Sequence, residues 1–165
     1  MRAISDVNAM TPADFIGAFG DVAEHSCWVA REAESFRPFF NRDELIKRFE
    51  GALRAANCDA QLALIRAHPD LATMAMLTDD SQHEQAGAGL NSLTSEEFAR
   101  FTALNDAYKQ RFGFPFIFAV KGATKQMILE SFEARVENAA DAEFAMALSQ
   151  VCRIFRFRIE DRVQA

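Results

Sequence analysis

His68 is the residue of this sequence that first suggests chemistry. It stands in the stretch "LIRAHPDLA", where an apolar helical run ends and Pro69 follows directly. An imidazole can transfer protons near neutral pH, because it titrates in that range. A histidine at a helix C-terminus can instead bind the last carbonyl groups, where the helix dipole favours it. On these grounds alone a structural role is favoured, and both roles stay open.

A second polar group lies in the stretch "SQHEQAGAGL", which begins at Ser81. Ser81 and Glu84 have the spacing of a capping box, which would begin a short helix ending at Gly87 or Gly89. In a functional role, Glu84 and Gln85 would present a carboxylate and an amide to a polar ligand at the helix N-terminus. The spacing by itself favours the cap.

The C-terminal helix, predicted over about 141–163, carries an arginine on its apolar face. At about 100° per residue, one apolar stripe is formed by Phe144, Leu148, Val151 and Phe155. Arg158 continues this stripe, and Arg162 lies on it closer to the chain end. A buried guanidinium needs an anionic or acceptor partner, because an isolated buried charge is very costly. That partner could be a bound anion or an internal Asp or Glu, and periodicity leaves both open.

Composition and motifs argue against several classes of protein. The net charge of −6 argues against a nucleic-acid partner, because phosphate binding needs concentrated Lys and Arg. His25, His68 and His83 lack the spacing of metal ligands, so we expect no metal. We find no phosphate loop, dinucleotide fingerprint or G-x-S-x-G motif. No apolar run could span a bilayer, and the three scattered cysteines fit a reduced protein, so we expect no membrane partner and a cytoplasmic location.

The hydrophobic pattern predicts a series of helices that must position these side chains. They cover about 12–22, 28–33, 41–56, 60–67, 71–77, 92–112, 124–138 and 141–163. Thr11, Asp59 and Asp70 are expected to cap three of them, and Pro69 must end the helix before it. Thr94 and Glu97 form a capping box for the clearest helix, which Gly113 ends.

One segment, at about 114–120, is apolar without helical period and is broken by Pro115. It is either a buried strand-like piece or an extended segment that lines a cavity. It has no evident partner strand, so the expected fold class is all-α with one extended apolar segment. We find no repeat, linker or low-complexity tract. The expected organisation is therefore one compact multi-helix domain over residues 1–165.

Taken together, these stretches resemble the 2-oxo-4-hydroxy-4-carboxy-5-ureidoimidazoline (OHCU) decarboxylases of urate degradation. The resemblance covers nearly the whole chain, in order, and includes "FIGAFGDVAEHSCWVA", "RPF", "LIRAHPDLA", "SQHEQAGAGL", "FTALNDAYKQRFGFPFIFAVKG" and "RIFRFRIEDRV". One departure is Cys27, where the family usually has a proline. It lies outside the blocks that carry the chemistry.

The resemblance implies an all-helical homodimer without metal or organic cofactor that converts OHCU to (S)-allantoin and CO2. It implies that His68 is the catalytic histidine and Glu84 its acidic partner. The substrate-binding positions that it implies are Pro69, Ser81, Gln85, Phe114, Phe116, Ile117, Phe118 and Arg158. The imine beside the departing carboxylate of OHCU can accept the released electron pair, so no cofactor would be required.

Two alternatives from other classes remain. A non-catalytic helical interaction module would use the same polar blocks as caps and ion pairs, and it predicts an exposed apolar groove. A different lyase or hydrolase could act on another ureido or purine-derived compound with the same residues. An assay with freshly generated OHCU would separate these possibilities.

Overall fold

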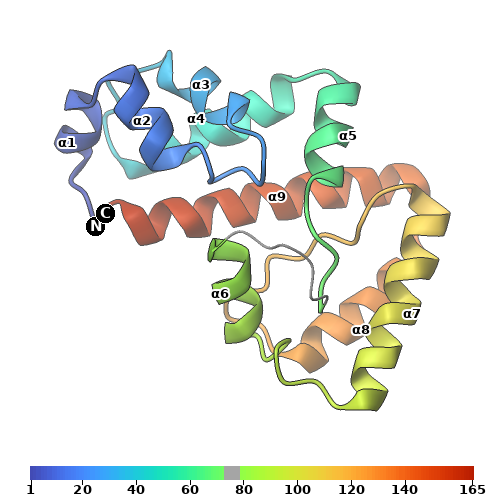
Figure 1. The fold of residues 1–165 in the computed structure, drawn as a ribbon. Coiled ribbons are helices and arrows are strands. Elements are labelled where there is room, and N and C mark those ends of the chain that lie inside the picture. Colours follow the sequence, from blue (N-terminus) through green and yellow to red (C-terminus); the bar gives the residue numbers. More distant parts are fainter. Residues whose placement is uncertain (73–78) are drawn as a thin grey trace. The chain divides into compact units, whose positions relative to one another are not determined.

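The computed structural model describes residues 1–72 and 79–165, and every regular element in these residues is a helix (Figure 1). The helices are α1 (Ile4–Ala9), α2 (Pro12–Phe19), α3 (Trp28–Glu34), α4 (Arg42–Ala55), α5 (Cys58–Arg66), α6 (Asp79–Gly87), α7 (Ser95–Phe112), α8 (Lys125–Arg135) and α9 (Ala140–Arg162). The predicted all-α class is confirmed. None of these helices is both long and apolar enough to cross a membrane.

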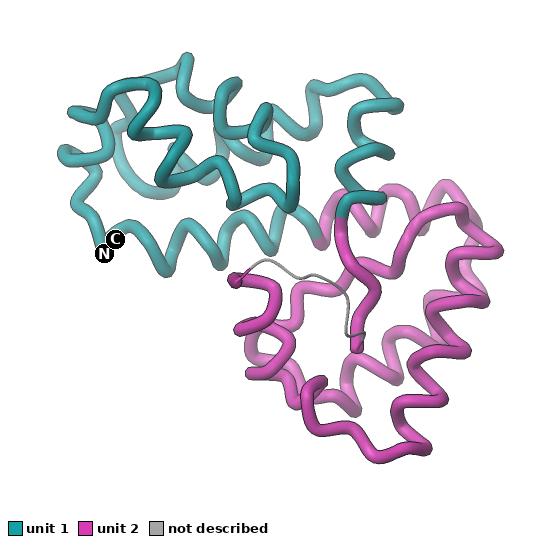
Figure 2. Tube along the Cα trace, viewed as in Figure 1, with its two compact units in different colours: residues 1–67, 151–165 teal, residues 68–150 magenta. Residues whose placement is uncertain are grey.

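The described residues divide into two compact units (Figure 2). Unit 1 comprises residues 1–67 and 151–165, and unit 2 comprises residues 68–150. The C-terminal half of α9 therefore belongs to unit 1 and its N-terminal half to unit 2. That the whole chain is one domain stays a prediction.

Unit 1 has a core of aromatic and aliphatic side chains between its helices. Leu45, Phe49 and Leu53 of α4 are all buried, as their four-residue spacing predicts. The ring of Phe49 meets that of Phe155 on α9 edge to face, with centroids 6.0 Å apart. The two chain ends are joined by backbone hydrogen bonds, including one of 2.7 Å from the Arg2 N–H to the Arg162 carbonyl.

Unit 2 is organised around α7 and the extended segment 114–120. The predicted capping box of Thr94 and Glu97 is present at the start of α7, and Gly113 ends the helix in the left-handed region at φ 77°. The segment after Gly113 contains no helix or strand, as predicted. Its Phe116 ring stacks on Phe132 of α8, with centroids 3.8 Å apart.

Several predictions of local detail need correction. The helix α1 was not predicted, because its six residues are too few to show a period. Asn57, and not Asp59, caps α5, because its side chain accepts the Ala60 N–H at 2.9 Å. The helix predicted over 71–77 with an Asp70 cap falls largely on residues 73–78, which lie outside the described residues.

The stripe predicted along α9 is only partly correct. Val151, Phe155 and Arg158 are buried, whereas Phe144 and Leu148 are half-buried. In the first half of the helix the buried face is instead displaced to a set that includes Glu143, Ala147 and Gln150. A single stripe cannot describe a helix whose two halves pack in different units.

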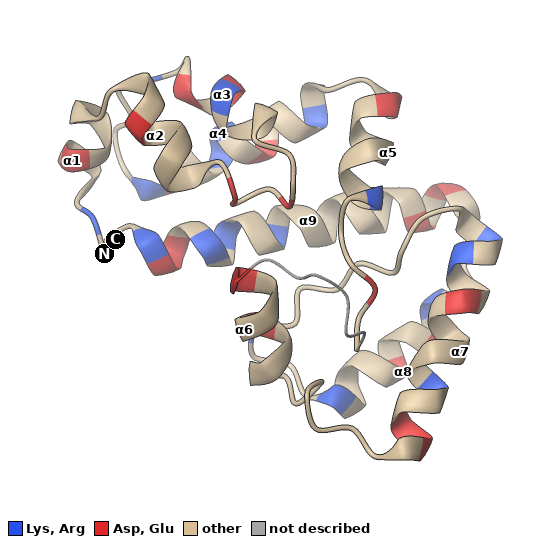
Figure 3. Ribbon diagram, in the orientation of Figure 1, with Lys and Arg blue, Asp and Glu red and all other residues tan. Residues whose placement is uncertain are grey.

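Charged residues of both signs lie along the longer helices α4, α7 and α9, whereas α2 and α6 carry acidic residues and no Lys or Arg (Figure 3). Arg48 pairs with Glu44 within α4 at 2.9 Å, and Arg100 of α7 pairs with Glu133 of α8 at 2.7 Å. Such exposed pairs contribute little to stability, about 0–1 kcal/mol each.

Candidate active site

His68 lies just beyond the end of α5 and is buried, with 8% of its surface exposed. The helix ends at Arg66, because the residue before a proline is pushed out of the α region. The burial of His68 is compatible with a role in a closed site.

The turn that follows His68 is fixed by three side chains. The Asp70 carboxylate binds the Lys109 ammonium at 2.6 Å. The Leu71 carbonyl accepts a hydrogen bond of 2.9 Å from the side-chain amide of Asn105, and the Ala72 N–H donates one of 3.0 Å to the Gln85 side-chain oxygen. Ala72 itself is left-handed at φ 60°, a conformation that a residue other than glycine rarely adopts.

Helix α6 carries three of the predicted site residues on one side. Ser81 and Gln85 are buried and lie one turn apart, and Glu84, next to Gln85, is half-buried. The capping-box interpretation of Ser81 and Glu84 is wrong, because the helix already begins at Asp79 and Ser81 lies within its first turn. The predicted end of this helix at Gly87 is confirmed.

The extended segment is held by side chains, and among residues 1–72 and 79–165 it has no partner strand. The Ile117 carbonyl accepts a hydrogen bond of 2.9 Å from Arg135, and the Ala119 N–H donates one of 3.0 Å to Gln150. Phe114, Phe116 and Ile117 are buried, and Phe118 is half-buried. These bonds meet the requirement that buried backbone groups find partners.

Arg135 belongs to a buried ionic cluster that the sequence analysis missed. Its guanidinium binds the Glu143 carboxylate through two nitrogens, and Glu143 also accepts hydrogen bonds from Tyr108 and Asn138. Burial and the bond to Glu143 raise the pKa of Tyr108. Burial tends to raise the pKa of Glu143, but its hydrogen bonds from Arg135, Tyr108 and Asn138 outweigh burial and lower it.

A signal for Arg135 was present in the sequence. Ile128, Phe132 and Arg135 lie at positions i, i+4 and i+7 of α8, and all three are buried. The same pattern singled out Arg158 on α9. An arginine that continues an apolar stripe is thus buried in both helices, and in both it has a carboxylate partner.

Arg158 lies in unit 1 and is 3% exposed. Its Nη1 atom donates a hydrogen bond of 2.9 Å to the carboxylate of Glu24, which is fully buried. The helical periodicity left two possible partners for Arg158, a bound anion or an internal carboxylate. The internal carboxylate is present. Arg162 on the same stripe donates to the Ala18 carbonyl at 2.9 Å and pairs with Asp21.

The predicted site residues fall into two sets. His68, Pro69, Ser81, Glu84, Gln85 and the segment 114–118 belong to unit 2, and Arg158 belongs to unit 1. Within unit 2, the bond from Ala72 to Gln85 joins the turn after His68 to the helix that carries Glu84. The convergence of Arg158 with the other residues stays a prediction. Within the described residues, we find no group of three His, Cys, Asp or Glu side chains that could hold a metal ion.

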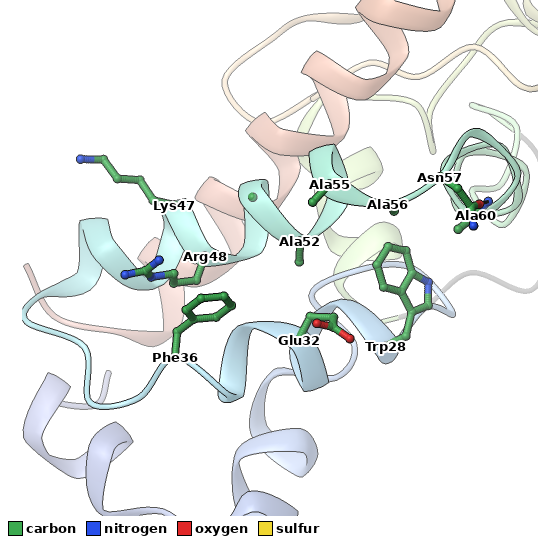
Figure 4. A pocket seen from close by; sticks show the side chains of 11 residues that line it. Trp28, Glu32, Phe36, Lys47, Arg48, Ala52, Ala55, Ala56, Asn57 and Ala60 are labelled. Atoms are coloured by element: carbon green, nitrogen blue, oxygen red, sulfur yellow. Dashed lines mark hydrogen bonds between the residues drawn. The ribbon is translucent and has the colours of Figure 1, made fainter.

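A separate hollow of about 520 Å³ lies in unit 1 between α3 and α4 (Figure 4). Trp28, Phe36 and Glu32 stand on one side, opposite small residues such as Ala52 and Ala55. None of the predicted site residues lines it. The hollow therefore does not belong to the candidate active site.

Comparison with known proteins places this geometry in a family. The family model described as OHCU decarboxylase matches residues 8–160. The OHCU decarboxylase of Haloferax volcanii is 42% identical over 159 residues, which cover 96% of this chain and 95% of that protein. The uric acid degradation bifunctional protein PucL of Bacillus subtilis is also 42% identical, over 98% of this chain, but the chain spans only 33% of that protein.

Two solved structures share the fold. A crystal structure of (S)-allantoin synthase superposes with a TM-score of 0.80 at 31% identity, covering 98% of this chain and 54% of that one. A crystal structure of OHCU decarboxylase in the presence of (S)-allantoin superposes with a TM-score of 0.71 at 23% identity, covering 85% of this chain and 93% of that one.

The fold and the full-length matches define an all-helical decarboxylase of urate degradation. The chain belongs to the OHCU decarboxylase family. The predicted family and the predicted class of enzyme, a lyase, are therefore confirmed.

Proposed function

We propose that this chain removes CO2 from OHCU and forms (S)-allantoin. The observation that carries the proposal is the near-complete match to an OHCU decarboxylase of similar length, at 42% identity. The turn after the buried His68 is hydrogen-bonded to Gln85, the neighbour of the half-buried Glu84, and His68 and Glu84 would supply the acid and base groups that the reaction needs.

The reaction requires the protein to orient the substrate and to transfer protons. The carboxylate of OHCU stands on a ring carbon that also bears a hydroxyl and lies next to a C=N bond. As the carbon–carboxylate bond breaks, CO2 leaves and its electron pair moves into the imine. Loss of the hydroxyl proton and protonation of the neighbouring carbon then give allantoin. Because the substrate contains its own electron sink, the reaction as we propose it uses no organic cofactor or metal.

We assign the proton transfers to His68. We assign Glu84 as its acidic partner, which forms a hydrogen bond with the substrate. Gln85 already uses its side-chain oxygen for Ala72, so its NH2 group is the part that we assign to the substrate. Ser81, Pro69 and the segment 114–118 would line the pocket. The buried phenylalanines of this segment would exclude water and so strengthen each polar contact.

We assign Arg158 to the substrate carboxylate or ureido oxygens. Glu24 binds the guanidinium through Nη1 and would fix its orientation. A guanidinium presents its N–H donors in a rigid planar fork that matches the geometry of a carboxylate or a ureido oxygen.

The experiment that tests the proposal is a coupled assay with freshly generated OHCU, read by circular dichroism of the allantoin product. Wild-type protein is expected to give dextrorotatory (S)-allantoin well above the rate of spontaneous decay. Decay at the uncatalysed rate would favour the interaction-module alternative. Conversion of a different ureido compound, with OHCU left untouched, would favour the other lyase or hydrolase.

A homodimer and a cytoplasmic location complete the proposal. Sedimentation equilibrium tests the first, because a dimer has twice the mass of the 18.5 kDa chain. Fractionation of cells that express the full-length protein tests the second. A monomer at micromolar concentration or recovery outside the cytoplasm would contradict the respective part.

A further inference from the structure

We propose that Asn105 and Lys109 of α7 are positioning residues for His68, acting through the turn of residues 69–72. This inference rests on the proposed function, in which His68 transfers the protons. Neither residue belongs to the proposed pocket or to the site residues predicted from the sequence. They lie one helical turn apart, so both face the same side of α7.

The contacts of Asn105 and Gln85 converge on a single peptide group. The Leu71 carbonyl and the Ala72 N–H belong to one planar unit, and in a trans peptide they point to opposite sides. Asn105 holds the carbonyl at 2.9 Å, and Gln85 holds the N–H at 3.0 Å. With both ends bound to rigid helices, the peptide plane cannot rotate, and this fixes the chain three residues after His68.

The peptide between Leu71 and Ala72 needs its hydrogen bonds to Asn105 and Gln85, which together we call the clamp. Ala72 is left-handed at φ 60°, a conformation that costs free energy for any residue with a Cβ and persists only where the surroundings impose it. Both amide side chains are almost fully buried, with 3% of Asn105 and 7% of Gln85 exposed. Buried peptide groups must be hydrogen-bonded, and these two side chains are the partners that the structure provides.

Lys109 adds a third point of attachment. Its ammonium binds Asp70 at 2.6 Å, two residues after His68. Three successive residues, Asp70, Leu71 and Ala72, are thus each tied to α6 or α7. Because Gln85 lies next to Glu84, the clamp also sets the distance between the His68 turn and the helix that carries Glu84.

A loose clamp should impair proton transfer more than substrate binding. Catalytic groups must be held within roughly 0.5 Å of the productive position, and a displacement of about 1 Å can cost about 100-fold in rate. We therefore expect Asn105→Leu, which keeps the size and removes the donor, to lower kcat about 10- to 100-fold. KM should change about threefold or less, because Ser81, Gln85 and the segment 114–118, which are most of the proposed binding groups, lie outside the turn.

The matched control is Gln61→Met in unit 1. Gln61 is also a buried amide that donates to a backbone carbonyl, that of Leu53, at 3.0 Å. Its loss should lower the melting temperature about as much as Asn105→Leu while leaving kcat unchanged. Equal loss of kcat in the two variants would overturn the inference, because it would show a general effect of stability.

The ion pair gives a second test that does not endanger folding. Lys109→Met removes the pair and should lower kcat about 3- to 10-fold, and Lys109→Arg, which can still bind Asp70, should restore most of it. The control is Arg100→Met on the same helix, which removes the exposed pair with Glu133. If Lys109→Met leaves kcat at the wild-type value, the role of Lys109 is refuted. If Asn105→Leu does not fold, Lys109→Met and Lys109→Arg still test whether attachment of the turn to α7 affects kcat.

An NMR titration separates this inference from the proposed function. The protein has three histidines, so the imidazole signal of His68 can be assigned with the His68→Asn variant. Asn105→Leu should shift this signal and its titration midpoint, and Gln61→Met should not. A shifted signal in a protein without decarboxylase activity would support the positioning role and refute the proposed function. An active protein whose His68 signal is the same in Asn105→Leu would refute the positioning role alone.

Discussion

Arg158 and Glu24 form an ion pair of 2.9 Å in which both side chains are buried. The pair joins α9 to the loop between α2 and α3, across 134 positions of sequence. Replacement of Arg158 alone would leave a carboxylate buried without this cation. A simple test of Arg158 as a substrate-binding group is therefore confounded by stability.

We predict that Arg158→Met lowers the free energy of unfolding by about 3–5 kcal/mol, because breaking a buried pair strands its other member. The double variant Glu24→Gln/Arg158→Met should regain most of that stability, since the uncompensated charge is gone. If Arg158 binds the substrate, the double variant should still show a large loss of kcat/KM. Urea unfolding and the allantoin assay measure the two effects. A stable double variant with wild-type kcat/KM would leave Arg158 with a structural role only.

His68→Ala should abolish enzymatic formation of allantoin while the protein still folds. Because the variant removes a buried side chain, we expect it to lower the free energy of unfolding by about 0.5–3 kcal/mol, which a melting curve measures. His68→Asn should still bind substrate without transferring protons. The control is His83→Ala, since His83 is exposed on α6. Near-full activity of His68→Ala, or its failure to fold, would support the structural interpretation of His68.

Product stereochemistry should depend on Glu84. A 99:1 preference for one face needs only about 2.7 kcal/mol between the competing transition states, which one positioned proton donor can supply. Glu84→Ala should act slowly, and its product should drift toward a racemate as uncatalysed decay takes over. Circular dichroism of the product follows this directly. Racemic allantoin from the wild type, above the background rate, would contradict a stereospecific decarboxylase.

The cluster of Arg135, Glu143 and Tyr108 should make stability depend on pH at both extremes. Glu143 has a lowered pKa in the folded state, so its contribution is present above its ordinary pKa of 4.5 and is lost as the pH falls through the lowered value. Tyr108 has a raised pKa, so its contribution is complete below its ordinary pKa of 10.0 and is lost as the pH rises through the raised value.

The loss of stability at alkaline pH, the alkaline limb of the curve of stability against pH, can be assigned to one group, because Tyr108 is the only tyrosine of the chain. We expect tyrosinate absorbance to appear together with unfolding above pH 10.0, and Tyr108→Phe to flatten this limb. Glu143→Gln should flatten the acidic limb and cost about 3–5 kcal/mol at neutral pH, because it breaks a buried ion pair. A freely titrating Tyr108 in folded protein would contradict this prediction.

Features that depend on near neighbours could be predicted from the sequence. Thr94 and Glu97 begin α7, Gly113 ends it in the left-handed region, and the Pro69 ring ends α5. Each of these depends on bonds or clashes within about four residues, so the local pattern contains the whole cause. The all-α class and the family follow from the same kind of information, summed along the chain.

Which polar groups contact one another could not be predicted from the sequence and is seen in the folded chain. The sequence marked Arg158 as a buried cation, but only packing brings it Glu24. It marked Gln85 as a candidate ligand, and the structure shows that its oxygen holds the turn after His68, opposite Asn105. A buried polar or charged side chain needs a hydrogen-bonding or ionic partner, but its own position in the sequence does not indicate which residue that partner is. The partner is set by the segments that pack together in the core, and these segments lie tens of residues apart in the chain.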